Sequence, residues 1–379
     1  MTPRQMAIVA PSNRNGGSND TGKDRMSDQD RFAGTMPVQD RHRFDEATLE
    51  LWLKENVPDY KGPLSVQQFK GGQSNPTFML VTPAKKYVLR RKPPGKLLPS
   101  AHAVDREYRV ITALAQTDVP VARTYGLCED DSVIGTAFYV MDCVEGRIFW
   151  DQRLPGLSRD ERAGIFDAMN RTIAALHQVD YNAIGLGDFG KPGDYFARQI
   201  SRWSKQYKAS ETEEIPAMDR LIEWLPAHIP PGDETTIVHG DFRMDNMIFH
   251  PTEPRVIAVL DWELSTLGHP LGDFTYHLMS WRLAPEIFRG LAGIDYAGLG
   301  IPTEKEYIDT YCRRTGRDGI PNLEFYMAYN MFRIAAILQG IMGRVKDGTA
   351  ASQHAIESGK RARPIAEQAW AVVERMAGG

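Results

Sequence analysis

Apolar residues follow a β-strand pattern in the first third of the chain and a helical pattern in most of the rest. A short amphipathic helix is predicted for FDEATLELWLKENV, and turn-like segments then separate the β-prone runs VQQFK, TFMLV and YVLRR. This arrangement is typical of hairpins. A helix is predicted next for AHAVDREYRVITALAQ, where apolar residues recur at helical spacing at Val104, Tyr108, Ile111 and Ala115. With the strand-like run VIGTAFYVM, residues 62–145 predict the order β-β-β-α-β-β.

The remainder of the chain is predicted to be mainly helical. The segment ERAGIFDAMNRTIAALHQV is strongly amphipathic, and its apolar face comprises Ile165, Met169, Ile173 and Leu176. Two short strands, NMIF and VIAVL, interrupt the helices, and long helical patterns fill residues 322–375. We therefore expect an α+β fold with a lobe built on a small mixed β-sheet and a second, mainly helical lobe.

The expected domain boundaries follow this change of pattern. Residues 1–40 are polar, rich in Ser, Asn, Asp and Gly, and show no periodicity. Such a segment cannot bury enough apolar surface to offset its ordering entropy, so we expect a disordered tail. Residues 41–145 are expected to form the first lobe and residues 146–379 the second.

The composition indicates a soluble globular protein. Of its 379 residues, 42% are hydrophobic and 25% are charged, which are ordinary values for such a protein. A net charge of −4 offers no basic field for nucleic acid. Three scattered cysteines without a CxxC pair exclude a zinc ribbon and fit a reducing compartment. No apolar run approaches the ~20 residues that span a bilayer, and no signal-peptide pattern is present. We therefore expect a cytoplasmic protein without a nucleic-acid or membrane partner, and the oligomeric state stays open.

One segment, IVHGDFRMDNMIFH at residues 237–250, concentrates polar side chains between two β-prone runs. An aspartate on such a loop, here Asp241, can accept the proton of an attacking hydroxyl. Asn246 can bind a metal through its amide oxygen, and Asp261 follows one hairpin later, at the end of VIAVL. Magnesium takes oxygen ligands and keeps waters, so two side chains and the phosphates suffice. The layout predicts phosphoryl transfer, in which Asp241 orients the acceptor hydroxyl while Asn246 and Asp261 hold Mg²⁺.

These motifs resemble those of the aminoglycoside phosphotransferase/choline kinase superfamily, which is related to the protein kinases. HGDFRMDN resembles its catalytic loop and LDWE its metal-binding segment, and the resemblance covers residues 60–375. It implies a bilobal protein-kinase-like fold. The segments FKGGQSNPTFML, YVLRRKPPGKLLPSAH and LDWELSTLGHPLGDFTYH resemble a narrower group. This group comprises the kinase-like domains that are found alone in bacteria and fused to acyl-CoA dehydrogenases in animals. Its members are implied to phosphorylate hydroxyacyl-CoA or related hydroxy acids.

The resemblance also implies a nucleotide site in the first lobe. Glycines in the first hairpin let backbone amides approach phosphates, and the candidate residues of this loop are Gly71, Gly72, Gln73, Ser74 and Asn75. The kinase plan places a cation on the third strand and a glutamate on the next helix, which here correspond to Arg90 and Glu107. Strand alternation puts Arg90 and Lys92 on one face and Arg91 on the other, so either Arg90 or Lys92 could reach the phosphates.

The remaining candidates have positioning or supporting roles. By resemblance, FYVMDCVEG is the hinge that holds adenine, with Met141 lining the pocket and the backbone of Asp142 and Val144 binding the base. We expect Arg243 to face the acceptor or the transferred phosphate. Three residues are interpreted as structural support: His239 orders the catalytic loop, Glu263 lies behind the metal ligands, and Asp273 caps the helix FTYHLMSW and ties the metal loop down. His177 is interpreted as a packed helix residue.

Charge is the sequence evidence on the acceptor. Residues 281–379 contain 13 Lys and Arg against 11 Asp and Glu, a balance of +2 in a chain of net −4. Clusters at Arg313, Arg314 and Arg317 and at Lys360, Arg361 and Arg363 favour an anionic acceptor, such as a CoA thioester or a carboxylate. Choline would require an aromatic cage, and candidate aromatics are present at Trp262, Tyr276, Trp281, Tyr326 and Tyr329.

The sequence therefore predicts a kinase that depends on ATP and magnesium and transfers the γ-phosphoryl group to a small-molecule hydroxyl. The acceptor is expected to be anionic. An aminoglycoside-type or choline-type kinase is the alternative among enzymes. A catalytically silent nucleotide-binding pseudokinase is the alternative from another class. The replacement of the usual lysine by Arg90 is the one feature that favours the pseudokinase.

Overall fold

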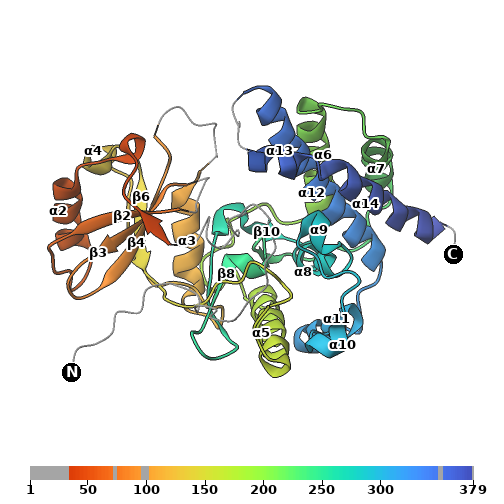
Figure 1. Ribbon diagram of the computed structural model, residues 1–379, viewed down its shortest axis with the longest axis horizontal. Helices are drawn as coiled ribbons and strands as arrows, with labels where there is room; N and C mark the ends of the chain where they lie inside the picture. Colours follow the sequence, from red (N-terminus) through yellow and green to blue (C-terminus); the bar gives the residue numbers. More distant parts are fainter. Residues whose placement is uncertain (1–33, 71–74, 95–101, 349–352, 378–379) are drawn as a thin grey trace, which may run out of the picture. The chain divides into compact units, whose positions relative to one another are not determined.

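The computed structural model describes residues 34–70, 75–94, 102–348 and 353–377 (Figure 1). The chain divides into two compact units. The first consists of Met1–Trp150 and Met244–Glu263, and the second of Asp151–Arg243 and Leu264–Gly379. The first unit is built on a β-sheet and the second is mainly helical, which confirms the predicted α+β fold.

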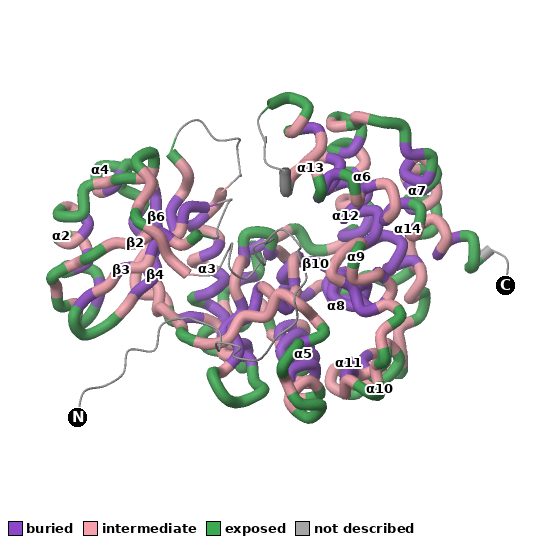
Figure 2. The backbone as a smooth tube through the Cα atoms, viewed as in Figure 1, coloured by how far each residue is buried: buried purple, intermediate pink, exposed green. Residues whose placement is uncertain are grey.

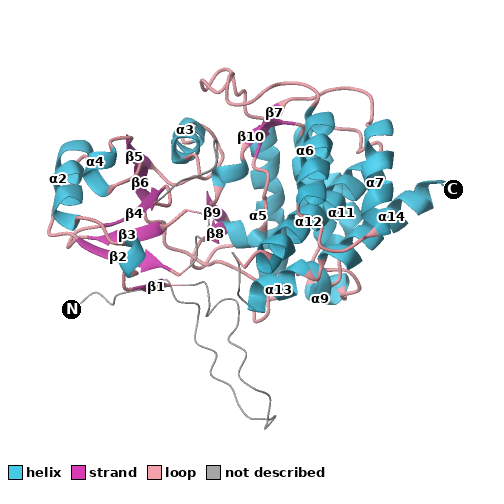
Figure 3. Cartoon of the chain, turned by 90° about the horizontal axis from the view of Figure 1, so that it is seen from above, coloured by secondary structure: helices cyan, strands magenta, loops and turns pink. Residues whose placement is uncertain are grey.

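A six-stranded sheet with the order β1-β2-β3-β4-β6-β5 organises the first unit (Figure 3). Its strands are β1 (Thr35–Met36), β2 (Ser65–Phe69), β3 (Thr77–Val81), β4 (Lys86–Arg91), β5 (Thr124–Cys128) and β6 (Phe138–Asp142). Every strand pair is antiparallel, whereas the sequence predicts a mixed sheet. Helix α3 (Val104–Leu114) carries the chain from β4 to β5, but β6 inserts between these two strands and prevents a parallel pair.

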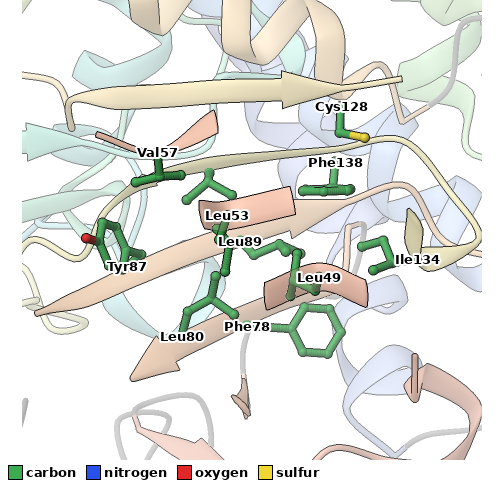
Figure 4. Packing of buried hydrophobic residues seen from close by; sticks show 11 residues of the cluster. Leu49, Leu53, Val57, Phe78, Leu80, Tyr87, Leu89, Cys128, Ile134 and Phe138 are labelled. Atoms are coloured by element: carbon green, nitrogen blue, oxygen red, sulfur yellow. The ribbon is translucent and has the colours of Figure 1, made fainter. Parts of the chain in front are cut away.

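The core of the first unit lies between the sheet and helix α2 (Glu46–Asn56) (Figure 4). Side chains alternate across a strand with a period of two residues. Phe78 and Leu80 on β3, Leu89 on β4, and Phe138 and Val140 on β6 therefore point to this core. The cluster also includes Leu49 and Leu53 of α2, Val57 just after it, Tyr87 of β4, Cys128 of β5 and Ile134 of the short helix that follows β5. The same alternation leaves the intervening residues of β4 and β6 for the opposite face.

The structure differs from the sequence prediction at the edges of this unit. Residues 34–40 were predicted to belong to the tail, but Thr35 of β1 pairs with Phe69, and helix η1 (Asp40–His42) follows. Backbone pairing does not depend on apolar side chains, so a polar segment can join a sheet edge. Residues 1–33 lie outside the described residues. The run VIGTAFYVM begins in a short helix, α4 (Asp131–Ile134), and its strand starts only at Phe138.

A hairpin of β8 (Met247–Phe249) and β9 (Val256–Val259) belongs to the first unit, although it lies within the predicted helical lobe. The backbone N–H of Val259 donates to the carbonyl of Pro120 at 2.8 Å. Arg147 and Phe249 exchange two backbone hydrogen bonds, each 2.8 Å long. These bonds join the hairpin to the end of the sheet region, so the predicted metal-binding segment shares a unit with β4 and α3.

Helices form most of the second unit. They are α5 (Arg159–His177), α6 (Tyr195–Ala209), α7 (Pro216–Ala227), α8 (Pro270–Leu278), α9 (Pro285–Phe288), α10 (Tyr296–Leu299), α11 (Glu304–Thr315), α12 (Leu323–Lys346), α13 (Gln353–Gly359) and α14 (Ala362–Ala377). Strands β7 (Thr236–Val238) and β10 (Thr266–Gly268) form an antiparallel pair. The 3₁₀ turn η4 (Met279–Trp281) also belongs to this unit, whereas η2 (Met244–Asn246) belongs to the first unit and η3 (Trp262–Leu264) spans the boundary between the two segments.

Helix α12 is the centre of this unit and packs against α6, α8, α13 and α14. Its side chains from Phe325 to Ala336 are buried without interruption (Figure 2). The predicted apolar face of α5 is confirmed, because Ile165, Met169, Ile173 and Leu176 are all buried. Within the described part of the chain, every helix is too short or too polar to span a bilayer.

Candidate active site

The predicted catalytic loop begins directly after β7 in the second unit. The His239 side chain is fully buried, and its Nδ1 accepts a hydrogen bond from the Asp241 backbone N–H at 3.1 Å. Gly240 has a φ of +82°, and a Cβ there would lie 2.8 Å from the carbonyl oxygen of Leu264. Only glycine combines this backbone conformation with this close approach. The loop that presents Asp241 is therefore a tight turn built on a buried histidine.

Asp273 on α8 anchors this turn. Its carboxylate accepts the backbone N–H groups of His239 and Gly240, each at 2.8 Å, and the His177 Nε2 lies 3.3 Å away. Burial raises the pKa of the Asp273 carboxyl, but the hydrogen bond and charge of His177 outweigh this effect and lower the pKa. The prediction that Asp273 caps its helix is wrong. His269 is the N-cap of α8, and its Nδ1 accepts from the Leu271 N–H at 3.2 Å.

The Asp241 carboxylate is held from two sides. The hydroxyl of Tyr276 donates a hydrogen bond to Oδ1, and the Arg243 Nε lies 3.2 Å from the same oxygen. Behind the loop, Nη2 of Arg333 donates to the Gly240 carbonyl at 2.6 Å. The sequence names Tyr276 only as a candidate aromatic for a choline cage, and it does not single out Arg333. One signal for Tyr276 exists, since it lies three residues after Asp273 on a helix and therefore shares its face.

A second cluster surrounds Arg90 in the first unit. Its Nε lies 2.7 Å from Oε2 of Glu107, and its Nη2 lies 2.7 Å from Oδ1 of Asp261. A third carboxylate, that of Glu263, is 3.5 Å away. Burial lowers the pKa of Arg90, but the charges of Glu107 and Asp261 outweigh it and raise the pKa. The cation and glutamate that the sequence pairs are thus in contact, and one of the predicted metal ligands joins them.

Neighbouring basic residues on β4 have other partners. Arg91 donates to the carbonyls of Ile134 and His42, on the face of the sheet opposite Arg90. Lys92 lies 3.7 Å from Asp105 of α3. The predicted alternation is therefore confirmed, because Arg90 and Lys92 both face α3. Arg90, and not Lys92, forms the ion pair with Glu107. A contact between Arg90 and phosphates stays a prediction.

Asn75 supports Glu107 in the structure. The Asn75 side chain is fully buried, its Nδ2 donates to Glu107 Oε1 at 2.9 Å, and its Oδ1 lies 2.9 Å from Nδ1 of His102. Tyr139 on β6 donates to the other oxygen of Glu107 at 3.0 Å. The Asn75 amide is thus engaged inside the protein, and a contact with phosphate stays a prediction. The other loop candidates, Gly71, Gly72, Gln73 and Ser74, lie outside the described residues.

The two predicted metal ligands lie at the same end of the β8–β9 hairpin. The Leu260 N–H donates to the Asn246 carbonyl at 2.8 Å, directly before Asp261. Asp261 adopts a positive φ of +66°, which turns the chain out of the β9 direction. An amide oxygen and a carboxylate are the kind of oxygen donors that magnesium accepts in proteins. The residues therefore fit a magnesium ion whose remaining ligands are phosphates and water.

The hinge candidates follow the end of β6. Met141, Asp142 and Val144 are half-buried. The Asp142 carboxylate is engaged by the Tyr125 hydroxyl at 2.5 Å and by Lys85 at 2.6 Å. These contacts fix the Asp142 side chain, and the predicted adenine-binding role belongs to the backbone. That role stays a prediction.

Ion pairs within the second unit engage much of the predicted basic region. Arg314 pairs with Asp167, Arg317 with Glu234, and Arg363 with Glu213. Arg282 lies between Glu304 and Glu324. The positive balance of residues 281–379 therefore does not translate into an open positive surface at these positions, and it provides weaker support for an anionic acceptor than the sequence suggests.

Comparison with known proteins assigns the chain to a family. A model of the phosphotransferase enzyme family matches residues 65–316. The chain belongs to this family. Acyl-CoA dehydrogenase family member 10 from Mus musculus is 48% identical over 339 residues, which cover 89% of this chain and 32% of that protein. Family member 11 from Rattus norvegicus is 45% identical over 342 residues, which cover 88% and 44%. This phosphotransferase chain thus spans less than half the length of either relative.

Solved structures confirm the kinase-like fold. A protein from Ralstonia eutropha JMP134, named after the aminoglycoside phosphotransferases, has 63% sequence identity and a TM-score of 0.82, covering 88% of this chain and 99% of that one. Choline kinase from Cryptosporidium parvum shares 11% identity with a TM-score of 0.56, covering 87% and 97%. A complex of the phosphotransferase APH(4)-Ia with AMP-PNP and hygromycin B shares 18% identity with a TM-score of 0.54, covering 85% and 98%. The last two likenesses concern the fold alone.

Proposed function

We propose that the protein transfers the γ-phosphoryl group of ATP, with magnesium, to the hydroxyl of a small anionic acceptor. The observation that carries this proposal is the contact of Arg90 with both Glu107 and Asp261. It brings the predicted phosphate-binding cation, its glutamate partner and a predicted metal ligand into one cluster. Membership of the phosphotransferase family supports the same reaction class.

The roles of the residues follow from phosphoryl-transfer chemistry. Asp241 orients the acceptor hydroxyl and accepts its proton as the new bond from oxygen to the γ-phosphorus forms. The bond between this phosphorus and the β,γ-bridging oxygen breaks, and ADP carries away the electron pair. Arg90 neutralises phosphate charge while Glu107 holds it in place. Asn246 and Asp261 would hold magnesium, which supplies charge neutralisation on the phosphates when it is bound.

The acceptor that we propose is a hydroxyacyl-CoA or a free hydroxy acid. Two long relatives that share 45% and 48% identity are named as acyl-CoA dehydrogenase family members, and a hydroxyacyl thioester belongs to the same chemistry. A choline-type acceptor has less support from the structure. A cage for a quaternary ammonium needs aromatic faces open to the ligand, but all five candidate aromatics are at most 4% exposed: Trp262, Tyr276, Trp281, Tyr326 and Tyr329.

The test is ADP release with ATP and magnesium across an acceptor panel. The panel contains hydroxyacyl-CoAs, free hydroxy acids, choline, amino alcohols, sugars and aminoglycosides. We expect turnover with the first two classes. Turnover with choline or an aminoglycoside instead would retain the kinase and reject the anionic acceptor.

Asp241→Asn is the decisive variant for the chemistry, because it keeps the shape of the side chain and removes the base. General-base catalysis contributes roughly 10²–10⁴-fold, so turnover should fall by about that factor while ATP binding, measured by calorimetry, stays unchanged. Asp241→Ala should behave in the same way. Wild-type turnover in both variants would refute the role of Asp241.

A further inference from the structure

Tyr276 is a buried tyrosine whose hydroxyl is directed at the Asp241 carboxylate. It lies on α8, one helical turn after Asp273, and its side chain is 4% exposed. Residues three apart on a helix lie on the same face. Asp273 holds the backbone N–H groups of the catalytic loop from this face, and Tyr276 holds the carboxylate of Asp241. One helix therefore positions both the backbone and the side chain of the predicted base.

Arg333 on α12 reinforces this arrangement from a second element. Its guanidinium lies 4.9 Å from the centroid of the Tyr276 ring, and it donates to the Gly240 carbonyl at 2.6 Å. The Gly240 peptide is thus held at its N–H by Asp273 and at its carbonyl by Arg333. A cation over the face of a phenol is attracted by the ring. Arg333 therefore fixes the Tyr276 ring and the turn before Asp241 together.

Packing alone does not explain the hydroxyl of Tyr276. A phenylalanine would fill nearly the same volume without burying a polar group, which is costly unless it is hydrogen-bonded. Burial and the Asp241 charge raise the pKa of Tyr276 well above its usual value, so the phenol remains a donor across the physiological pH range. A hydrogen bond to an ionised carboxylate is stronger than one between neutral groups. It restricts the rotation of the carboxylate that must meet the acceptor hydroxyl.

We propose that Tyr276 is a positioning residue for the Asp241 base and that Arg333 fixes the position of Tyr276 relative to the catalytic loop. This inference rests on the proposed function and adds a residue to it. Catalysis requires the reacting atoms to be held in a near-attack arrangement, and a small displacement lowers the rate substantially. The Tyr276 hydroxyl holds Asp241 in that arrangement before the acceptor binds.

The first test is Tyr276→Phe. A hydrogen bond to a charged group contributes about 1.5–3 kcal/mol, so its loss should lower kcat roughly tenfold or more. The KM for ATP should stay unchanged, because Tyr276 belongs to the second unit and Arg90 to the first. The matched control is Tyr307→Phe. Tyr307 is also buried, and its hydroxyl bonds Nε2 of His277 at 2.9 Å, the residue next to Tyr276. A purely structural role would give both variants the same kcat and the same loss of thermal stability.

The second test uses fluorinated tyrosine, introduced singly at position 276 or at position 307. Fluorine changes the donor strength of the phenol with little change in shape, so kcat should change with the number of fluorines at 276 and not at 307. The ¹⁹F resonance at 276 should also shift in Asp241→Asn, and the resonance at 307 should not. This spectroscopic readout needs no turnover, so it remains valid if no acceptor in the panel is phosphorylated.

Two outcomes would overturn the inference. One is a kcat of Tyr276→Phe equal to that of Tyr307→Phe in an active enzyme. The other is a ¹⁹F resonance at position 276 that does not respond to Asp241→Asn. An inactive wild-type protein with a responsive resonance would instead reject the proposed function and keep the contact between Tyr276 and Asp241.

Discussion

Two buried arginines hold the two halves of the candidate chemistry, and they do so by opposite means. In the first unit, the Arg90 guanidinium faces three carboxylates, those of Glu107, Asp261 and Glu263. In the second unit, Arg333 bonds a backbone carbonyl and lies over aromatic faces, 4.9 Å from the Tyr276 centroid and 5.7 Å from that of Trp203. One arginine belongs to an ionic cluster, and the other is held by neutral groups.

The difference between the two clusters matches the charge of the ligand that each is proposed to bind. Three carboxylates around one guanidinium leave a local excess of negative charge, which suits a divalent cation. Around Asp241, positive charge comes from Arg243, whose Nε lies 3.2 Å from Oδ1. Burial lowers the pKa of Arg333, but its interactions with Tyr329, Tyr195 and Tyr276, and least of all with Asp241, outweigh burial and raise the pKa. That balance suits an anionic phosphoryl group. The proposed cation site and the proposed transfer site therefore differ in the sign of their local charge, a difference that the net charge of the chain does not reveal.

The largest expected effect on stability is that of Arg90→Gln. Removing one partner of a buried ion pair leaves an uncompensated charge, here on Glu107, and costs about 3–5 kcal/mol. Arg333→Gln should cost less, about 1–3 kcal/mol, because it leaves a neutral carbonyl without a donor. Urea unfolding monitored by circular dichroism would measure both free energies of unfolding.

The double variant Arg90→Gln/Glu107→Gln is the control for this comparison. It should recover part of the lost stability, since no buried glutamate charge remains. The free energy of unfolding should decrease less in Arg90→Lys than in Arg90→Gln, because lysine keeps the positive charge. Equal losses in Arg90→Gln and Arg333→Gln would contradict the distinction between the ionic and the neutral arginine.

Acid should weaken the second unit through two buried histidines. Burial lowers the pKa of His277 to about 3 and that of His269 to about 4. Each imidazole is harder to protonate in the folded state than in the unfolded state. Above about pH 6.5 both states keep these histidines neutral, and the free energy of unfolding is unaffected by them. As the pH falls from 6.5 towards 4, the unfolded state binds protons that the folded state does not, so the free energy of unfolding decreases by about 1.4 kcal/mol per pH unit for each histidine.

Unfolding free energies measured between pH 7 and pH 4 would check this slope. His269→Asn and His277→Gln should each remove one histidine's share of the pH dependence, whatever their effect at pH 7. A flat profile in the wild type over this range would show that the two histidines are not buried in the neutral form.

The smallest expected effect belongs to the residues that support Glu107. Asn75→Ala and Tyr139→Phe each remove one hydrogen-bond donor from its carboxylate, and each should cost about 1 kcal/mol. Arg90 should then be held less firmly, so ATP affinity should fall a few-fold in both variants. Isothermal titration would measure it. Unchanged affinity in both would indicate that Arg90 positions itself without this support.

Regular elements and the central motif were predictable from the sequence because they rest on local patterns. Strands β2, β3 and β4 follow from β-prone runs separated by turn-like segments, and the buried face of α5 follows from helical spacing. The pairing of Arg90 with Glu107 followed from the resemblance of YVLRR and DREYRV to the kinase plan. The helix-capping role of Asp273 was predicted incorrectly, since a short polar residue near a helix start is a common cap. Its carboxylate instead supports the catalytic loop at His239, 34 residues earlier.

What the sequence determined by itself is the class of fold, the phosphotransferase family and the spacing of Asp241, Asn246 and Asp261, all of which are encoded within short segments. Only the tertiary structure decided which side chains hold these residues. Arg90 and Asp261 are 171 positions apart, Arg333 and Gly240 are 93 apart, and Tyr276 and Asp241 are 35 apart. Such contacts depend on how sheets and helices pack, and no local pattern of hydrophobic and polar residues specifies them. The basic residues near the C-terminus cannot be assigned partners from local sequence either, because their acidic partners, such as Asp167 for Arg314, lie far away in the chain.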